Sequence, residues 1–267
     1  MKIPFFQVDA FVTGQPFSGN PAGVCLLPEP RDEAWMQKAA MEVNQAETAF
    51  LHPEKDGYRL RWFTPTMEIA LCGHATLASA HVLWQEGIIK KKEEARFWTQ
   101  SGLLTAVLQG DLILLNFPAM PAGPCEGVPG LEESLGAKVL SLGRTNAYYL
   151  AELSSAEVVR RVKPDFKLLE SVLRDQKLLG VAVTAPSDDK AYDFVSRFFA
   201  PAAGIPEDPV TGSAHCCLGP FWEARLHQNT FSAYQASARG GALQVCCEGG
   251  RVYLGGKAVT VIRGEWL

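Results

Sequence analysis

The sequence contains two copies of a short series of motifs that follow one another in the same order. Phe63-Thr64-Pro65 returns as Phe199-Ala200-Pro201, 136 residues further along. Cys72-Gly73-His74-Ala75-Thr76 returns as Thr211-Gly212-Ser213-Ala214-His215, 139 residues further along. Ordered matches at a nearly constant spacing indicate a duplicated unit. We therefore expect two similar α+β domains, each with strands wrapped around one central helix.

Hydrophobic periodicity places a helix directly after each glycine-containing motif. Residues 75–84 are small and apolar on nearly all sides, which is typical of a buried helix. The matching helix is expected at residues 214–226, where Gly219-Pro220 should kink or split it. An earlier helix is expected at residues 32–43, with Asp32 as its N-terminal cap.

The best domain boundary lies in the segment 118–129, which contains four Pro and two Gly residues. Strands at 103–108 and 112–117 form a predicted hairpin directly before it. We therefore expect an N-terminal barrel domain at 1–118 and a C-terminal barrel domain at 119–267. The last strand of the chain could return to the N-terminal domain.

Composition excludes several classes of function. The formal net charge is −4, with 25 basic and 29 acidic residues, so clustered phosphate contacts to a nucleic acid are not expected. No apolar stretch approaches the ~20 residues that span a bilayer, so no membrane contact is expected. The N-terminus lacks the features of a signal peptide, which predicts a cytoplasmic protein. The seven Cys and five His show no metal-ligand spacing, so reduced thiols and no metal site are expected.

Two helix starts are candidate binding sites for a carboxylate. A helix that begins at glycine presents unpaired backbone N–H groups and a partial positive charge to an anion. Gly73 opens one such helix, and Gly212 with Ser213 opens the other. If the two domains face each other, both starts would hold an organic acid in a cleft between them. The alternative is that these glycines only form tight turns.

Three polar residues are candidate catalytic groups. Glu47 lies between the end of a helix and a strand that enters the core, where apolar neighbours would disfavour its charged form, as suits a general base. His74 follows Gly73 and could exchange a proton near neutral pH. Asp208 directly precedes the second helix start. The alternatives are an exposed turn for Glu47, a structural hydrogen bond for His74 and a turn cap for Asp208.

The motifs together resemble the phenazine-biosynthesis PhzF-like family over essentially the whole chain, and six of them occur in family order. They are Ser18-Gly19-Asn20-Pro21-Ala22, Glu47-Thr48-Ala49-Phe50, Phe63-Thr64-Pro65, Cys72-Gly73-His74-Ala75-Thr76, the segment Glu207-Asp208-Pro209-Val210-Thr211-Gly212-Ser213, and Arg239-Gly240-Gly241.

The resemblance implies a diaminopimelate-epimerase-like fold with two pseudo-twofold related domains and the active site between them. It implies isomerisation of a small carboxylic acid by proton transfer, with no cofactor, and a homodimer. The proton-shuttling Glu of the family matches Glu47. The family's helix-start His matches His74, its Asp matches Asp208, and its Gly-Ser helix start matches Gly212-Ser213.

Two alternatives to the isomerase stay open. The first is an epimerase or racemase, or a hydroxy-acid dehydratase, that uses Cys72. Relatives of this fold that invert a stereocentre use two cysteines, whereas the position that corresponds to Cys72 holds Thr211, a far weaker acid than a thiol. The second is a small-molecule-binding protein with a non-catalytic site, because a fold does not by itself guarantee an activity.

Overall fold

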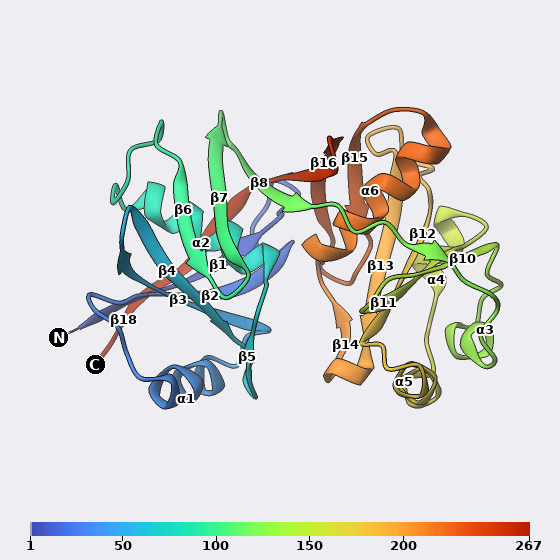
Figure 1. Ribbon diagram of the computed structural model, residues 1–267, viewed down its shortest axis with the longest axis horizontal. Helices are drawn as coiled ribbons and strands as arrows, with labels where there is room; N and C mark the ends of the chain where they lie inside the picture. Colours follow the sequence, from blue (N-terminus) through green and yellow to red (C-terminus); the bar gives the residue numbers. More distant parts are fainter. Residues whose placement is uncertain (1) are drawn as a thin grey trace. The chain divides into compact units, whose positions relative to one another are not determined.

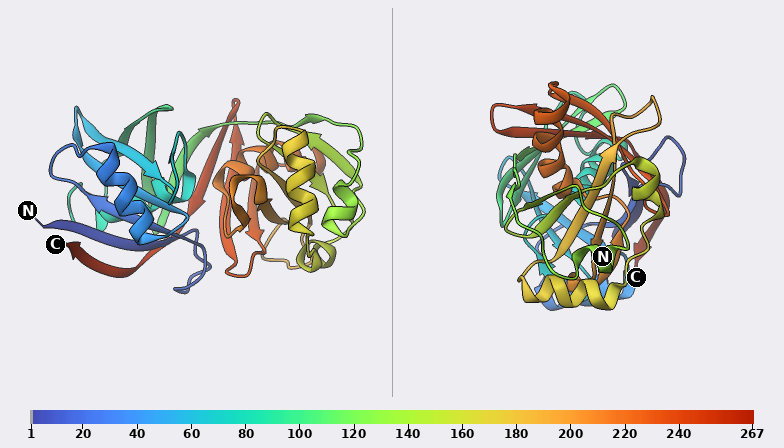
Figure 2. Two further views of the ribbon diagram at one scale, coloured as in Figure 1. Left: turned by 90° about the horizontal axis from the view of Figure 1, so that it is seen from below. Right: turned by 90° about the vertical axis from the view of Figure 1, so that its right-hand side faces the viewer.

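The computed structural model describes residues 2–267, and its backbone divides into two compact units (Figure 1). The first unit comprises the residues up to Phe117 together with Leu254–Leu267, and the second comprises Pro118–Tyr253. The C-terminal segment therefore belongs to the first unit. Within that unit β1 and β18 lie side by side (Figure 2) and pair antiparallel, with Ile3 opposite Trp266.

The first unit is a strongly curved arrangement of strands with two helices. Its elements are β1 (Ile3–Ala10), β2 (Asn20–Leu26), α1 (Glu33–Val43), β3 (Glu47–Glu54), β4 (Gly57–Phe63), β5 (Glu68–Ile69), α2 (Gly73–Gln85), β6 (Ala95–Thr99), β7 (Gly102–Gln109), β8 (Leu112–Pro118) and β18 (Ala258–Trp266). The pair β2 and β3 is parallel, β3 and β4 are antiparallel, β4 and β6 are parallel, and β6 and β7 are antiparallel.

The second unit contains the remaining elements. They are β9 (Gly123–Pro124), α3 (Leu131–Leu135), β10 (Ser141–Arg144), β11 (Tyr148–Glu152), α4 (Ala156–Arg161), α5 (Phe166–Asp175), β12 (Gly180–Pro186), β13 (Phe194–Ala200), the 3₁₀ helix η1 (Pro201–Ala203), β14 (Ile205–Asp208), α6 (Gly212–Leu226), β15 (Thr230–Gln235), β16 (Gly241–Glu248) and most of β17 (Arg251–Gly256).

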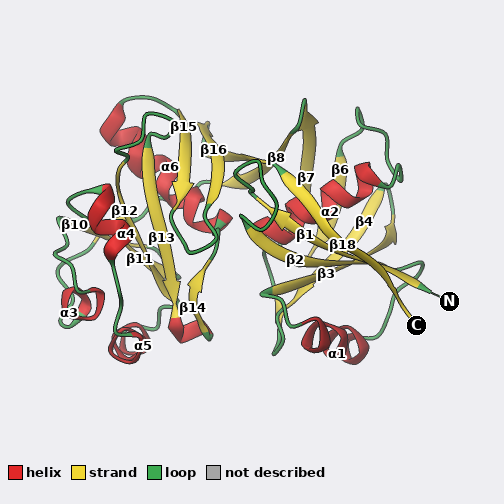
Figure 3. Cartoon of the chain, turned by 180° about the vertical axis from the view of Figure 1, so that it is seen from behind, coloured by secondary structure: helices red, strands yellow, loops and turns green. Residues whose placement is uncertain are grey.

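The strand pairing of the first unit recurs in the second. The pair β11 and β12 is parallel, β12 and β13 are antiparallel, β13 and β15 are parallel, and β15 and β16 are antiparallel. In each unit one helix lies among the strands, α2 in the first and α6 in the second (Figure 3). We call β2 to β7 the first repeat and β11 to β16 the second repeat.

An arginine pair marks the duplication at the level of side chains. Arg61 on β4 donates two hydrogen bonds of 2.7 Å to the carboxylate of Glu68. Arg197 on β13 donates two, of 2.7 and 2.9 Å, to the carboxylate of Glu207. The two arginines are 136 residues apart and the two glutamates 139, which are the spacings of the sequence motifs. The repeat predicted from the sequence therefore extends to buried ion pairs.

Helix α2 is buried almost all round, as its uniformly small and apolar sequence predicted. It packs against β1, β2, β3 and β18. Its buried residues are His74, Ala75, Thr76, Leu77, Ala78, Ser79, Ala80, Val82, Leu83 and Trp84. Helix α1 is also confirmed, because the Asp32 carboxylate accepts a 2.8 Å hydrogen bond from the backbone N–H of Trp35.

Helix α6 corrects one expectation, because Gly219-Pro220 does not split it. The helix runs without interruption from Gly212 to Leu226 with Pro220 inside. Proline cannot donate to the carbonyl four residues earlier, that of Cys216, but the backbone N–H of Met120 does so at 2.9 Å. A Cβ on Gly219 would stand 2.8 Å from Cys247 Sγ, so glycine permits close contact with β16.

All seven cysteines lie within residues 2–267 and are free thiols, as expected. No helix in this part of the chain is long and apolar enough to cross a membrane.

Candidate active site

The site is built first on Glu47, the residue that opens β3. Helix α1 ends at Asn44, which adopts the left-handed conformation (φ 52°) that reverses the chain direction after a helix. The chain then enters β3, where Glu47 lies beside Ala22 of the parallel strand β2. Strand pairing on both sides of β3 leaves Glu47 only 8% exposed. A carboxylate this buried is uncommon unless it is paired or functional.

The second part of the site is the start of α2. Cys72 is the N-cap residue in an extended conformation, and Gly73 is the first helical residue. Among residues 2–267, no side chain makes a capping hydrogen bond to this helix start. His74 follows in the first turn and is 4% exposed. The end of α2 therefore keeps its partial positive charge without a side-chain acceptor.

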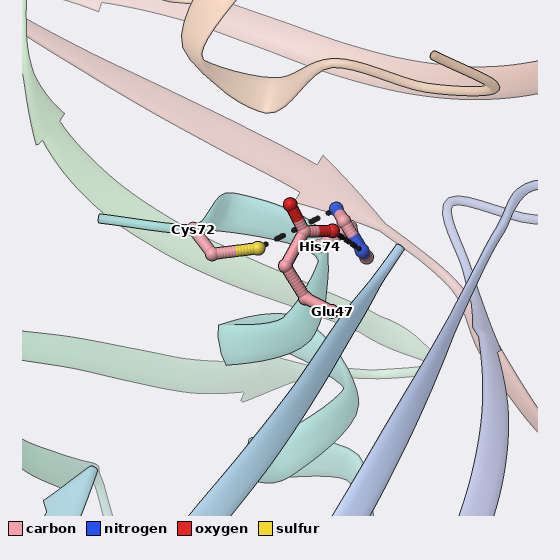
Figure 4. Close-up of side chains that lie close together, drawn as sticks. All are labelled: Glu47, Cys72 and His74. Atoms are coloured by element: carbon pink, nitrogen blue, oxygen red, sulfur yellow. Dashed lines mark hydrogen bonds and ion pairs between the residues drawn. The ribbon is translucent and has the colours of Figure 1, made fainter. Parts of the chain in front are cut away.

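The side chains of Glu47, Cys72 and His74 meet in one cluster (Figure 4). Glu47 Oε2 lies 3.1 Å from His74 Nε2, and Cys72 Sγ lies 3.5 Å from His74 Nδ1. The side-chain amide nitrogen of Asn20, a fully buried residue, is 3.2 Å from the same Nδ1. The imidazole is thus held on both of its nitrogens, and one of them faces the carboxylate.

Burial and charge act in opposite directions on His74. Burial alone would lower the pKa of His74, but attraction to Cys72 and Glu47 outweighs it and raises that pKa well above its ordinary value. For Cys72, burial dominates and raises the pKa of the thiol, with partial relief from His74. The favoured state is an imidazolium beside a carboxylate with a protonated thiol next to them.

The other predicted residues gather around the start of α6 in the second unit. Asp208 ends β14, and its carboxylate accepts a 2.5 Å hydrogen bond from the hydroxyl of Thr211, the N-cap residue of α6. Gln235 binds the backbone of both residues, accepting from Thr211 N–H at 2.9 Å and donating to the Asp208 carbonyl at 2.8 Å. The Ser213 carbonyl accepts from the Tyr148 hydroxyl at 2.9 Å.

This second helix start resembles the first in its open end. Gly212 is its first residue, and within the described chain no side chain makes a capping hydrogen bond to it. Gly212 is buried and Ser213 half-buried. The structure therefore gathers Glu47, Gly73 and His74 in one group, and Asp208, Gly212 and Ser213 in another.

The chain matches, over residues 8–264, the profile of the family described as phenazine biosynthesis-like protein. It belongs to this family. An uncharacterized isomerase of Halalkalibacterium halodurans is 51% identical over 268 residues, covering 100% of this chain and 99% of that protein. The crystal structure of a PhzF-family phenazine biosynthesis protein from Enterococcus faecalis has a TM-score of 0.93 at 41% identity, covering 100% of both chains.

The fold reaches beyond the PhzF family. The crystal structure of a probable proline racemase from Agrobacterium radiobacter has a TM-score of 0.69 at 12% identity, covering 99% of this chain and 93% of that one. At that identity the likeness shows the fold alone. The resemblance and the α+β fold class predicted from the sequence, with strands around a central helix in each of two similar domains, are confirmed.

Two positioning residues of this PhzF-family chain were not assigned from the sequence. Asn20 contacts His74, and its only signal was its place in the motif Ser18-Gly19-Asn20-Pro21-Ala22. Gln235 bridges Asp208 and Thr211 from β15, and nothing in its local sequence indicates this. Both contacts join segments far apart in the chain, so only the folded structure places them.

Proposed function

We propose that this PhzF-family chain is an isomerase that moves a proton between two carbons of a small carboxylic acid, with Glu47 as general base and without a cofactor. The observation that carries the proposal is the buried contact of 3.1 Å between Glu47 Oε2 and His74 Nε2 at the start of α2. A carboxylate fixed by a partner and shielded from water is suited to remove a proton from carbon.

The start of α2 supplies the anchor for the substrate. Its first backbone N–H groups have no side-chain cap within the described residues, and the helix dipole adds positive charge at this end. A substrate carboxylate bound at Gly73 would satisfy these donors. The same positive end stabilises negative charge that develops on the substrate when Glu47 removes its proton.

The proposed reaction needs no electron donor or acceptor. Glu47 takes a proton from a carbon next to an unsaturated group, and the electron pair of that C–H bond forms a new double bond. The old double bond opens at its far carbon, which receives a proton from protonated Glu47 or from the His74 imidazolium. The product has the same atoms as the substrate with its double bond shifted.

The test is Glu47→Gln, assayed by deuterium uptake from heavy water into a panel of small carboxylic acids. Because the amide cannot accept the proton, exchange should fall by about 10²-fold to 10⁴-fold, the usual contribution of a positioned acid–base group. The matched control is Glu54→Gln at the other end of β3, where the side chain is 31% exposed. Normal exchange in a folded Glu47→Gln protein would remove Glu47 from the mechanism.

A thiol-based epimerase or racemase is the second candidate, because Cys72 Sγ lies 3.5 Å from His74 Nδ1 in the same cluster. Against it, burial raises the pKa of the Cys72 thiol, and Thr211 stands at the corresponding position of the second repeat. Cys72→Ser separates the two candidates. The Glu47 isomerase keeps its exchange rate within about threefold, whereas a thiol-based enzyme loses about 10²-fold or more.

Asp208, Gly212 and Ser213 stay predicted substrate-binding residues. Ser213→Ala tests this group, because a lost substrate contact raises KM, whereas a purely structural serine leaves KM unchanged. The homodimer and the cytoplasmic location also stay predictions, which sedimentation and cell fractionation test.

A further inference from the structure

The cluster of Glu47, Cys72 and His74 contains the three kinds of side chain that bind zinc. One ligand atom from each lies within 4.8 Å of the other two, and all three residues are buried. Their positions in the sequence, 47, 72 and 74, follow no metal-ligand spacing, so only the fold brings them together. A thiolate sulfur, an imidazole nitrogen and a carboxylate oxygen form a typical three-ligand set with one open position.

Two of the atoms are short of partners. Glu47 Oε2 and His74 Nε2 are buried and have no hydrogen-bond partner among the described residues. They are 3.1 Å apart, yet their angle does not meet that of a hydrogen bond. Adjacent ligands of a tetrahedral zinc ion lie about 3.3–3.8 Å apart. Side-chain rotations of about 1 Å would therefore bring the cluster to zinc geometry.

Asn20 supplies the contact that a metal-bound histidine needs on its other nitrogen. Its side-chain amide lies 3.2 Å from His74 Nδ1. A ligand histidine usually donates its second N–H to an oxygen, which fixes the ring. The Asn20 amide offers N–H to a bare Nδ1 and its carbonyl oxygen to a protonated one, so a half-turn of the amide serves either state.

Charge also fits a divalent ion. A Glu47 carboxylate and a Cys72 thiolate together balance the two charges of Zn²⁺, so the occupied cluster would carry no net charge in its buried place. The sulfur and nitrogen ligands favour Zn²⁺ over Mg²⁺, which prefers an all-oxygen shell.

We propose that Glu47, Cys72 and His74 form a Zn²⁺-binding site and that the bound ion blocks proton transfer by Glu47. The blocking rests on the proposed function, whereas the binding does not. Bound Zn²⁺ engages the carboxylate oxygen that would accept the substrate proton. Zinc is thus an inhibitor of this site rather than a cofactor of its reaction.

Cobalt(II) is the probe for binding, because its thiolate charge-transfer band and visible bands report a four-coordinate site directly. Chelator-treated protein titrated with Co²⁺ should show both bands, saturating at one ion per chain, and Zn²⁺ but not excess Mg²⁺ should abolish them. Cys72→Ser should remove the charge-transfer band, and Glu47→Gln should keep it while weakening affinity at least about tenfold. Cys246→Ser, a half-buried thiol in the second unit, is the matched control and should change nothing.

The outcomes separate the two proposals. A band that is absent, that survives Cys72→Ser or that disappears in Cys246→Ser overturns the zinc site, whatever the enzyme does. If the band behaves as expected but one equivalent of Zn²⁺ leaves deuterium exchange unchanged, inhibition is wrong. If chelated wild-type protein shows no exchange with any acid while the cobalt site is intact, the proposed function fails and the metal site stands.

Discussion

The two repeats share a framework but not their chemical groups. Both have the same order of parallel and antiparallel strand pairs, the same Arg–Glu pair and a central helix that begins at glycine. Cys72 and His74 of the first repeat correspond to Thr211 and Ser213 of the second. The duplication therefore preserves what holds a repeat together, and the titratable groups at the helix start occur in the first repeat alone.

The position of Glu47 shows the same difference. Thr48 pairs with Phe63, and Val181 pairs with Phe199, so Glu47 corresponds to Gly180 at the start of β12. A Cβ on Gly180 would stand 2.5 Å from the carbonyl oxygen of Phe199. Steric crowding thus excludes an acidic side chain from the second repeat at the place where the first has its candidate base.

The largest effect is expected when the first helix start receives the residue of the second. His74→Ser removes the imidazole that contacts Glu47 Oε2 and should lower deuterium exchange about 10³-fold, or about 4 kcal/mol of transition-state stabilisation. Ser213→Ala should lower exchange far less, because Ser213 adds no titratable group. Equal losses in the two variants would contradict the assignment of the chemistry to the first repeat.

Gly180→Ala should be the next largest change and should act on stability. The new methyl group must displace the Phe199 carbonyl, and overpacking of this kind costs about 3 kcal/mol. Urea unfolding measures it. The control is Gly264→Ala on β18, where no heavy atom lies within 4 Å of the added Cβ. A neutral Gly180→Ala would mean that sterics did not exclude Glu from this position.

His215 should make the second repeat sensitive to acid. Burial lowers the pKa of His215 to about 4, and its Nδ1 donates to the Thr211 carbonyl at 2.9 Å. Between that pKa and the ordinary value near 6.5, the unfolded chain binds a proton that the folded chain excludes, so stability falls as pH falls. The loss from pH 7 to pH 5 should be about 2 kcal/mol.

The first repeat provides the substitution that tests this. Thr76 stands where the second repeat has His215 and donates its hydroxyl to the Cys72 carbonyl in the same way. His215→Thr should keep that hydrogen bond and reduce the loss of stability between pH 7 and pH 5 by about 2 kcal/mol, measured by urea unfolding at both pH values. An unchanged pH dependence would show that His215 is not the group responsible.

The smallest effect separates the two Arg–Glu pairs. Arg61 has a second carboxylate, Glu33, at 2.7 Å, whereas the other hydrogen bonds of Arg197 go to backbone carbonyl oxygens of Val159, Arg160 and Val162. Glu207→Gln should therefore lower the free energy of unfolding by about 1 kcal/mol, and Glu68→Gln by less. Thermal unfolding of both variants compares them, and a larger loss for Glu68→Gln would contradict this ranking.

Local patterns predicted the elements that depend on neighbours in the chain. Asp32 caps α1 because a cap needs only the next turn of helix, and the apolar run after Gly73 is a buried helix because no face of it is polar. The uninterrupted α6 could not be predicted locally. Its Pro220 is tolerated because Met120, a hundred residues away, satisfies the Cys216 carbonyl.

The sequence alone determined the duplication, the family and the choice of Glu47 and His74 as candidate residues, because each of these is carried by residue types at fixed spacing. Only the tertiary structure decided that the two side chains lie 3.1 Å apart, that Cys72 joins them and that Asn20 holds the imidazole. Such contacts arise from the pairing of β3 with β2 and from the packing of α2 against both strands. Strand register and helix packing are long-range properties, and no local pattern encodes the distance between two side chains.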